Sequence, residues 1–590
     1  MRFVLAIVSF LLAAVLIGAG IAQKTIFAPP ERVTESISVD STAPVTIIDG
    51  ATLNAFPRSQ TVMIDGSPNV FAAYGRTTDV LAWVGDASYN TIGYDAEAQA
   101  LTSETITQAT ETVPDPAGSD LWYQDYTSPL SLGFTVKVPN DISLIIVSDG
   151  QTPAPANVTL SWPLDSTTPW SAPLIVAGGV LLLLGLAFLV WAITHLRNAR
   201  GPRRKQPKMP KMPKLPKPPR YKPVKQKALA PTSRGRRSTR TGMMAAPLVL
   251  VASLTLGACS AMPAATSTPE PTTSADSTQA VEPAAVEAPA IKEGQAKRII
   301  ADVAAVAAKA DKANNAKLLS SRFAGPALER RTAAYKIHKA DSKQDPLLTI
   351  PSGPVRVTLP SLSADWPRTV FAVVQGDDAE EVPTVAFMLI QDDPRANYKV
   401  HYVMNLEPGS VLPELASAAV GTARVPEDFK FLTLQPDQVA AAYGDILMKG
   451  KKSKSFALFD AEGDTLRTAV GVEAKKARQK KLPDTAKLTF ANGVGTGQTV
   501  VMTTNDSGAI VAVELTESET VKPVESGAAV NAPKDVKALL GKSQSTKGIQ
   551  AEYADQLLFY VPSLAAGGTI KLLGYSQGLI DASELKKKKN

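Results

Sequence analysis

Few residues in this sequence could carry out chemistry. Its 590 residues include one cysteine and three histidines. A single cysteine excludes an intramolecular disulfide, a Cys-rich zinc site and an iron–sulfur cluster. The histidines, His195, His338 and His401, are far apart in the chain. The composition therefore leaves little material for a metal site or for acid–base catalysis.

One segment near the C-terminus has the spacing of a catalytic serine. Gly574-Tyr575-Ser576-Gln577-Gly578 matches the Gly-x-Ser-x-Gly turn that presents a nucleophile after a strand. The acid and the histidine of such a triad follow the serine in the chain. Only 12 residues follow Gly578, and the last histidine is His401. We predict that Gly574 and Gly578 are turn residues at the end of a last strand, and we assign no catalytic, cofactor-binding or metal-ligating residue.

The remaining glycine-rich and acidic motifs have structural explanations. Residues 493–497 alternate glycine with other residues but lack the spacing of a dinucleotide loop, so we predict a hairpin loop. Three acidic pairs stand beside turn residues, and we predict solvated carboxylates there rather than a calcium or glycosidase site. These pairs are Asp377-Asp378, Glu380-Glu381 and Asp392-Asp393.

The cysteine stands in a distinctive context. The 14 uncharged residues 245–258 end in Leu256-Gly257-Ala258, directly before Cys259, and a polar tether follows. This order resembles the lipobox of bacterial lipoproteins, in which the cysteine sulfur receives a diacylglyceryl group and the preceding peptide bond is cut. The resemblance makes Cys259 a lipidation candidate, although a lipobox normally lies near the N-terminus and this one is internal.

Three interpretations of this segment stay open. It is a third membrane span left uncut, or a functional lipobox that releases a lipoprotein beginning at Cys259, or a segment that does not cross. The first two place residues 260–590 outside the cell, and the third keeps them in the cytoplasm.

Two longer apolar runs predict membrane segments. Residues 3–22 carry no charge and are long enough for a transmembrane anchor, with a cleaved signal peptide as the competing interpretation. Residues 173–194 form a second uninterrupted run that predicts a transmembrane helix.

The distribution of charge orients these segments. The chain has a net charge of +7, but 17 of its 62 basic residues lie between Arg197 and Arg240, where no acidic residue occurs. A short basic loop stays in the cytoplasm, so we predict a Pro-rich cytoplasmic linker at residues 195–242. It either binds anionic lipid headgroups or only fixes topology. Residues 24–170 carry 17 acidic and 5 basic side chains, which argues against a nucleic-acid partner.

Residues 24–170 have an all-β pattern. Short apolar runs separated by turn residues predict an extracytoplasmic antiparallel β-sandwich. Its tyrosines and tryptophans either line a carbohydrate-binding face or pack in the core. The runs lie at residues 45–48, 61–64, 80–84, 133–138, 142–147 and 158–162.

The C-terminal part has a mixed pattern. After the short apolar segment at residues 243–259, residues 260–290 have the composition of a disordered tether. Helical spacing followed by strand-like runs then occurs twice, which predicts α+β modules at residues 291–430 and 431–585, with helices packed on curved antiparallel sheets. This order is similar to that of the nuclear-transport-factor-two-like and cystatin-like superfamilies.

These patterns together indicate a bacterial cell-envelope protein, and the Ala-rich composition is typical of a high-GC actinobacterium. We predict non-enzymatic binding or scaffolding at the outer face of the cytoplasmic membrane. The expected partners are the lipid bilayer and a cell-wall polymer or an envelope protein. The alternative is an envelope enzyme, or an accessory subunit of one, that acts on cell-wall glycan.

Overall fold

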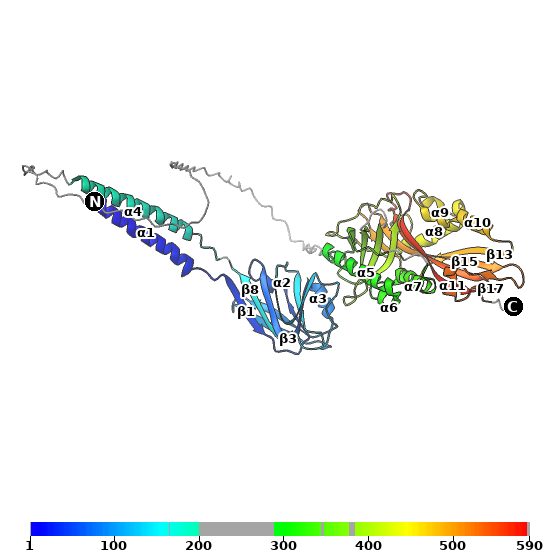
Figure 1. Cartoon of the computed structure of the whole chain (residues 1–590), viewed down its shortest axis with the longest axis horizontal. Helices are drawn as coiled ribbons and strands as arrows, with labels where there is room; N and C mark the ends of the chain where they lie inside the picture. The colour runs from blue at the N-terminus through cyan, green and yellow to red at the C-terminus, as the bar shows by residue number, and fades with distance from the viewer. Residues whose placement is uncertain are drawn as a thin grey trace, which may run out of the picture. The chain divides into compact units, whose positions relative to one another are not determined.

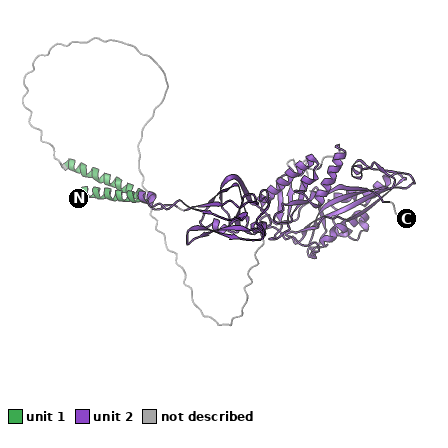
Figure 2. Ribbon diagram, turned by 90° about the horizontal axis from the view of Figure 1, so that it is seen from below, with its two compact units in different colours: residues 1–19, 173–284 green, residues 20–172, 285–590 purple. Residues whose placement is uncertain are grey.

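The computed structural model describes residues 2–164, 166–199, 288–343, 347, 349–376 and 384–586. The chain divides into two compact units, and each is described by itself. Unit 1 contains residues 1–19 and 173–284, and unit 2 contains residues 20–172 and 285–590 (Figure 2).

Two apolar helices carry the predicted membrane segments. They are α1 (Arg2–Thr25) and α4 (Ser171–Ala199), and both are long and apolar enough to cross a membrane. A signal sequence has the same properties as α1, so both predictions for residues 3–22 stand. Within unit 1, a Cβ at Gly178 of α4 would meet Ile17 at 2.6 Å and one at Gly185 would meet Phe10 at 3.1 Å. Glycine thus lets α1 and α4 approach closely.

The first part of unit 2 is a sheet domain, which we call the β domain (residues 32–163). Its eight strands follow the order β1-β8-β3-β7-β2-β4-β5, and β6 pairs with β3 (Figure 1). The elements are β1 (Arg32–Ser38), β2 (Val45–Ile48), α2 (Gly50–Leu53), β3 (Gln60–Arg76), α3 (Thr77–Val84), β4 (Tyr89–Asp95), β5 (Ala100–Ile106), β6 (Gln124–Val136), β7 (Ile142–Val147) and β8 (Asn157–Pro163).

The predicted two-sheet antiparallel sandwich needs correction. The described strands form one hydrogen-bonded sheet, because the long strand β3 pairs with β8 through its first half and with β7 through its second. One pair is also parallel, since Val45 of β2 lies opposite Tyr89 of β4. Parallel neighbours need a crossover connection, and here β3 and α3 supply it.

The strand predicted at residues 80–84 is also wrong, because these residues belong to α3. Val80, Trp83 and Val84 are buried, whereas Leu81 is exposed. Positions i, i+3 and i+4 lie on one face of a helix, so this spacing buries an apolar stripe that a strand would divide between two faces.

The C-terminal domain (residues 288–586) repeats the predicted order of helices followed by antiparallel strands. Its first half contains α5 (Glu293–Ala313), α6 (Ala316–Leu319), α7 (Gly325–Ala340), β9 (Val355–Pro360), β10 (Arg368–Val374), β11 (Val385–Gln391) and β12 (Lys399–Leu406). Its second half contains α8 (Pro436–Lys449), η1 (Gly450–Lys452), η2 (Phe456–Leu458), α9 (Thr465–Val470), α10 (Val472–Lys481), β13 (Ala486–Val494), β14 (Val500–Thr503), β15 (Ala509–Pro523), β16 (Val530–Asn531), α11 (Lys534–Leu540), β17 (Gln544–Ser545), β18 (Ile549–Val561) and β19 (Lys571–Glu584).

The two halves share a single nine-stranded sheet. The sheet joins where Asn405 and Leu406 of β12 lie opposite Tyr575 and Gly574 of β19. Helices α5 to α7 cover the core of the first half, and α8 covers that of the second. A third core contains residues from the strands of both halves. The halves therefore fold as one body.

Candidate functional site: an ionic interface and a pocket

Within unit 2, buried ion pairs join the β domain to the C-terminal domain. Arg368, the first residue of β10, is fully buried, and its Nη2 donates to Asp79 Oδ1 of α3 at 2.7 Å. The other oxygen of Asp79 accepts from Arg76 Nε at 3.0 Å. One carboxylate of the β domain is thus shared between two guanidinium groups. We call the contacts between the two domains the ionic interface.

An aromatic side chain accompanies this pair. The guanidinium of Arg368 lies 3.8 Å from the ring centroid of Trp366, close enough for a cation–π contact. Trp366 packs against the β-domain core that contains Trp83 and Trp122, and its Nε1 donates to Gln391 Oε1 at 3.0 Å. A side chain of one domain therefore completes the core of the other.

A second buried pair lies at Asp120 of the β domain. Its Oδ2 accepts from Arg322 Nη1 at 2.5 Å and from the backbone amide of Tyr398 at 2.8 Å. Burial raises the pKa of Asp120, while the positive charge of Arg322 opposes that rise. Asn397 adds two contacts, because its Oδ1 accepts from the Asp120 amide and its Nδ2 donates to Gly118 O.

Helix α5 supplies further donors to the same segment. Gln295 Nε2 donates to the carbonyls of Asp120 and Leu121 at 3.2 and 3.1 Å. Arg298 donates to the next two carbonyls, those of Trp122 and Tyr123. These contacts give hydrogen-bond donors to backbone carbonyls that precede β6 and take no part in strand pairing.

Arg395 closes the interface at the end of α3. Its Nε donates to Trp83 O and its Nη2 to Val84 O, both at 2.8 Å. The last carbonyls of a helix lack internal partners and carry partial negative charge, so a cation there is favourable. Most of these contacts place carboxylates and carbonyls of the β domain opposite guanidinium groups of the C-terminal domain. Arg76 of the β domain donates in the opposite direction, from its Nη2 to Ala290 O at 3.1 Å.

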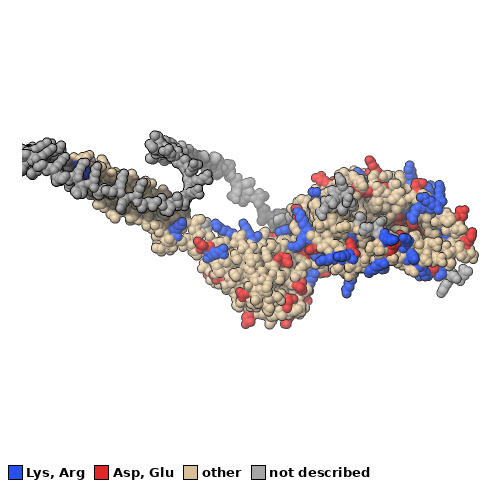
Figure 3. Space-filling view, viewed as in Figure 1, with Lys and Arg blue, Asp and Glu red and all other residues tan. Residues whose placement is uncertain are grey.

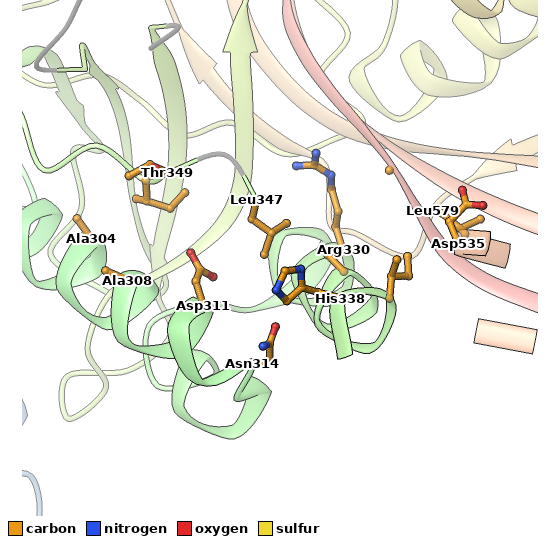
Figure 4. Close-up of a pocket in the computed structure, with 14 residues that line it drawn as sticks. Ala304, Ala308, Asp311, Asn314, Arg330, His338, Leu347, Thr349, Asp535 and Leu579 are labelled. Carbon is orange, nitrogen blue, oxygen red and sulfur yellow. The ribbon is translucent and has the colours of Figure 1, made fainter. Parts of the chain in front are cut away.

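The second candidate site is an open pocket in the C-terminal domain, with a volume of about 560 Å³. Figure 4 shows Arg330 and His338 extending from α7, with Asp311 of α5 across the pocket. Its lining comes from α5, α7, α11, β19 and the segment after α7: Ala304, Ala308, Asp311, Asn314, Arg330, Ala334, Ile337, His338, Leu347, Thr349, Ile350, Asp535, Gly578 and Leu579.

Arg330 is the notable charge in this pocket. Its Nη1 donates to Ser576 Oγ at 3.4 Å, and it makes no ion pair with a carboxylate in the described part of the chain. Burial, together with the positive charge of Arg331, lowers the pKa of Arg330 to about 10. The neighbouring Arg331 differs, because Asp311 lies 2.5 Å from its Nη1.

The structure explains the Gly-x-Ser-x-Gly segment without catalysis. The predicted turn is wrong, because Gly574, Ser576 and Gly578 lie inside β19. The buried Oγ of Ser576 donates to Val403 O at 2.7 Å. A Cβ at Gly574 would lie 2.5 Å from Asn405 O, and one at Gly578 would lie 2.6 Å from Arg330 Nε. The glycines therefore permit the join between β12 and β19 and make room for Arg330.

The predicted hairpin at residues 493–497 is wrong. β13 and β14 pair with the same strand, β15, so the segment interrupts one edge strand. The amide of Gly497 donates to Glu514 Oε2 at 2.8 Å, and a Cβ at Gly495 would lie 2.3 Å from Glu514 Cγ. A buried glutamate thus occupies the space that a regular strand would need.

The structure describes one of the three acidic pairs. Asp393 Oδ1 accepts from the amides of Arg395 and Ala396, both at 2.9 Å, so Asp393 forms the predicted turn. Asp377, Asp378, Glu380 and Glu381 lie outside the described residues. Within the described ranges, no three His, Cys, Asp or Glu side chains gather as a metal site would require.

The aromatic residues of the β domain do not form one binding face. Trp83 and Trp122 are buried and meet edge to face at 5.5 Å. Tyr94 instead contacts Trp162 at 5.4 Å, in the core on the other face of the sheet. These aromatics pack in two cores, which supports the packing interpretation.

The lipidation candidate lies outside the described residues, since these exclude Cys259 and its lipobox residues Leu256, Gly257 and Ala258. Most of the predicted Pro-rich linker also lies outside them, although Arg197 is described. The lipobox stays a prediction.

The ionic interface did not follow from the sequence. Asp79, Asp120, Arg322 and Arg368 stand in no recognisable motif, and ion pairs between distant residues leave no local pattern. The signal that could have pointed to them is the acidic excess of residues 24–170, visible as scattered Asp and Glu on the β domain in Figure 3. An acidic surface suits contacts from arginine side chains, and here those arginines belong to the same chain.

Comparison with known proteins gives one match. The model of a family described as a domain of unknown function (DUF8094) matches residues 287–584, which span α5 to β19 and therefore both halves of the nine-stranded sheet. No curated protein matches the chain, and no solved structure matches it.

Proposed function

This chain belongs to the family described as a domain of unknown function (DUF8094), and we propose that it is a non-enzymatic scaffold at the outer face of the bacterial cytoplasmic membrane. In this proposal the β domain is a membrane-anchored platform, and the C-terminal domain is held on it. The observation that carries the proposal is the ionic interface. Its buried pairs, Asp79–Arg368 and Asp120–Arg322, are contacts suited to holding two domains together.

The ionic interface also supports the predicted topology. If α4 spans the membrane, the chain leaves the β domain on one side and continues on the other. The contacts can form only when both domains lie on the same side. The chain must then return, or be cut and released outside, between residues 199 and 288. The uncharged segment 245–258 is the stretch of that sequence suited to either event.

Cys259 has a defined role in this proposal. If the third span is left uncut, residues 260–590 lie outside the membrane as part of one continuous polypeptide. Cleavage before Cys259 would give two polypeptides, the second carrying its own lipid, and the ionic interface would keep them together. Both forms place the C-terminal domain beside the membrane, whereas a cytoplasmic C-terminal domain is incompatible with the interface.

The surface of the C-terminal domain suits an anionic partner. Figure 3 shows Lys and Arg gathered near the end that carries α10. The exposed lysines there without an ion pair in the described residues are Lys451, Lys452, Lys454, Lys480 and Lys481. We therefore propose an anionic cell-wall polymer as the partner class. Binding of the full chain to polyphosphate beads should fall at least tenfold when Lys451, Lys452 and Lys480 become glutamate.

A protease-release experiment tests the scaffold. A specific protease site is placed within residues 265–285 of a Cys259→Ser chain, and intact spheroplasts are treated with the protease. We expect cleavage, with the C-terminal fragment still sedimenting with membranes because the interface holds it. In the Asp79→Lys/Asp120→Lys chain the fragment should move to the supernatant.

Two further chains complete the design. Glu97→Lys changes an exposed acid of the same domain and should retain the fragment. Adding Arg322→Glu to Asp120→Lys should restore at least part of the retention that Asp120→Lys alone loses. Release of the fragment from the parent chain would refute the scaffold. Cleavage only after the spheroplasts are lysed would refute the topology.

A further inference from the structure

We propose that the pocket beside Arg330 binds an organic carboxylate with an apolar body. The pocket is a second function of the C-terminal domain, separate from the ionic interface. No interface residue lines it.

Among the described residues, the guanidinium of Arg330 has no carboxylate counterion, unlike three other arginines of this domain. Arg331 is paired with Asp311, and Arg322 and Arg368 are paired across the interface. Arg330 makes one long hydrogen bond, to Ser576 Oγ at 3.4 Å. A partly buried guanidinium with free donors at a cavity wall suits an oxyanion, which it can bind through two parallel hydrogen bonds.

The other charges of the pocket favour a ligand with one negative group. Asp311 is neutralised by Arg331 and also accepts from Tyr335 Oη at 2.6 Å. Asp535, in the first turn of α11, makes no ion pair in the described part of the chain, so its negative charge would repel a second anionic group. A ligand with a single carboxylate directed at Arg330 therefore fits this wall better than a dianion.

Apart from Asn314, His338 and Thr349, the remaining lining is apolar. Ala308, Ala334 and Leu579 come from three different elements and offer small or aliphatic surfaces. A volume of about 560 Å³ lies within the range of small-molecule sites, which combine mostly apolar linings with a few fixed polar groups. A benzyl-sized or short aliphatic body would fit within this space and occupy part of it, while its carboxylate reaches Arg330.

Gly578 keeps this geometry open. A Cβ at this position would lie 2.6 Å from Arg330 Nε and 3.1 Å from its Cγ, so any other residue would displace the arginine. Gly578 lies inside β19, where glycine weakens a strand. Glycine at this position therefore makes room for the Arg330 side chain, although it weakens β19.

Calorimetry on the full chain in lipid nanodiscs tests the site, with empty nanodiscs subtracted. The probes are 4-phenylbutanoate, its neutral amide 4-phenylbutanamide, and phenyl phosphate. We expect the carboxylate to bind at least tenfold more tightly than the amide and than the phosphate. Arg330→Met should abolish that preference while leaving amide binding unchanged.

Two variants keep the result interpretable. Lys336→Met removes an exposed cation from the same helix and should change nothing. Ala308→Trp places a bulky side chain at the apolar wall of the pocket and should weaken binding of both carboxylate and amide, which tests the site even if Arg330→Met fails to fold. Equal affinities for carboxylate and amide, or a preference that survives Arg330→Met, would overturn the proposal. Tighter binding of phenyl phosphate would overturn the assignment of the carboxylate.

Discussion

Arg368 at the ionic interface and Arg330 in the pocket are arginines in contrasting surroundings. Arg368 has a carboxylate at 2.7 Å, a tryptophan ring beneath its guanidinium and no exposure to solvent. Arg330 has a serine hydroxyl at 3.4 Å and borders a cavity. The comparison teaches that buried charge has two uses in this domain. A matched charge joins two parts of the chain, and an unmatched one remains available to a ligand.

Removing the carboxylate at the interface should have the largest effect. Asp79→Ala leaves Arg368 buried without its counterion, and removing one partner of a buried pair typically costs about 3–5 kcal/mol. We expect α3 and β10 to lose protection by at least a hundredfold in hydrogen–deuterium exchange of the full chain. Glu97→Ala, an exposed acid in the same domain, should leave protection unchanged. Equal protection in both variants would contradict the view that this pair joins the domains.

A buried acid offers the mirror image of Arg330, because Asp555 of β18 makes no ion pair among the described residues. Asp555 is fully buried, and burial, reinforced by the charge of Glu517, raises its pKa to about 8. Below about pH 4 the folded and unfolded states both hold the proton. As the pH rises, the unfolded carboxyl loses its proton first, so the folded state loses stability until the pH passes about 8.

Asp555→Asn should therefore stabilise the C-terminal domain above pH 6. We expect a gain of about 2 kcal/mol at pH 8 and little change at pH 4, because the amide needs no deprotonation. Pulse proteolysis in urea at pH 4, 6 and 8 measures the free energy of unfolding. Asp581→Asn, an exposed acid of β19, is the control and should not flatten the pH profile. A variant as pH-dependent as the parent would show that Asp555 is not the titrating group.

The end of α3 provides an intermediate case, because Arg395 is matched by carbonyls instead of a carboxylate. Arg395→Met removes two charge-assisted hydrogen bonds to Trp83 and Val84. The loss should be about 1–2 kcal/mol, smaller than for Asp79→Ala, since a carbonyl left without a cation costs less than a buried charge left without a partner. Hydrogen–deuterium exchange of the α3 amides measures this loss of stability. Arg356→Met, an exposed arginine on β9, should leave that exchange unaffected.

The sequence predicted local patterns well and long-range contacts poorly. The apolar runs of α1 and α4 and the twice-repeated order of helices and strands follow from periodicity, which each segment carries in itself. The single sheet of the β domain could not be predicted from periodicity. It depends on β3 pairing with both β7 and β8, and the sequence of a strand does not specify which strands it pairs with. The likeness to nuclear-transport-factor-two-like and cystatin-like folds stays a prediction, since no solved structure matches.

The candidate site shows the same division. The sequence drew attention to Ser576 through its flanking glycines, yet those glycines serve the join to β12 and the side chain of Arg330, which is 246 residues away. A sequence motif consists of residues that are close in the chain, whereas the pocket is lined by residues from five separate segments, so no motif could predict it. The lipobox, in contrast, can be detected from the sequence, because its chemistry depends on four consecutive residues.

Arg330→Met should have the smallest effect on stability, and this outcome separates the two kinds of arginine most sharply. Methionine retains the aliphatic volume beside Gly578 while removing a charge whose burial is uncompensated. The lost hydrogen bond to Ser576 is long, and Ser576 Oγ keeps its bond to Val403 O. We therefore expect the free energy of unfolding to change by less than about 1 kcal/mol, in either direction, in pulse proteolysis of the ligand-free chain. A loss as large as that of Asp79→Ala would mean that Arg330 has a structural partner and is not held in place for a ligand.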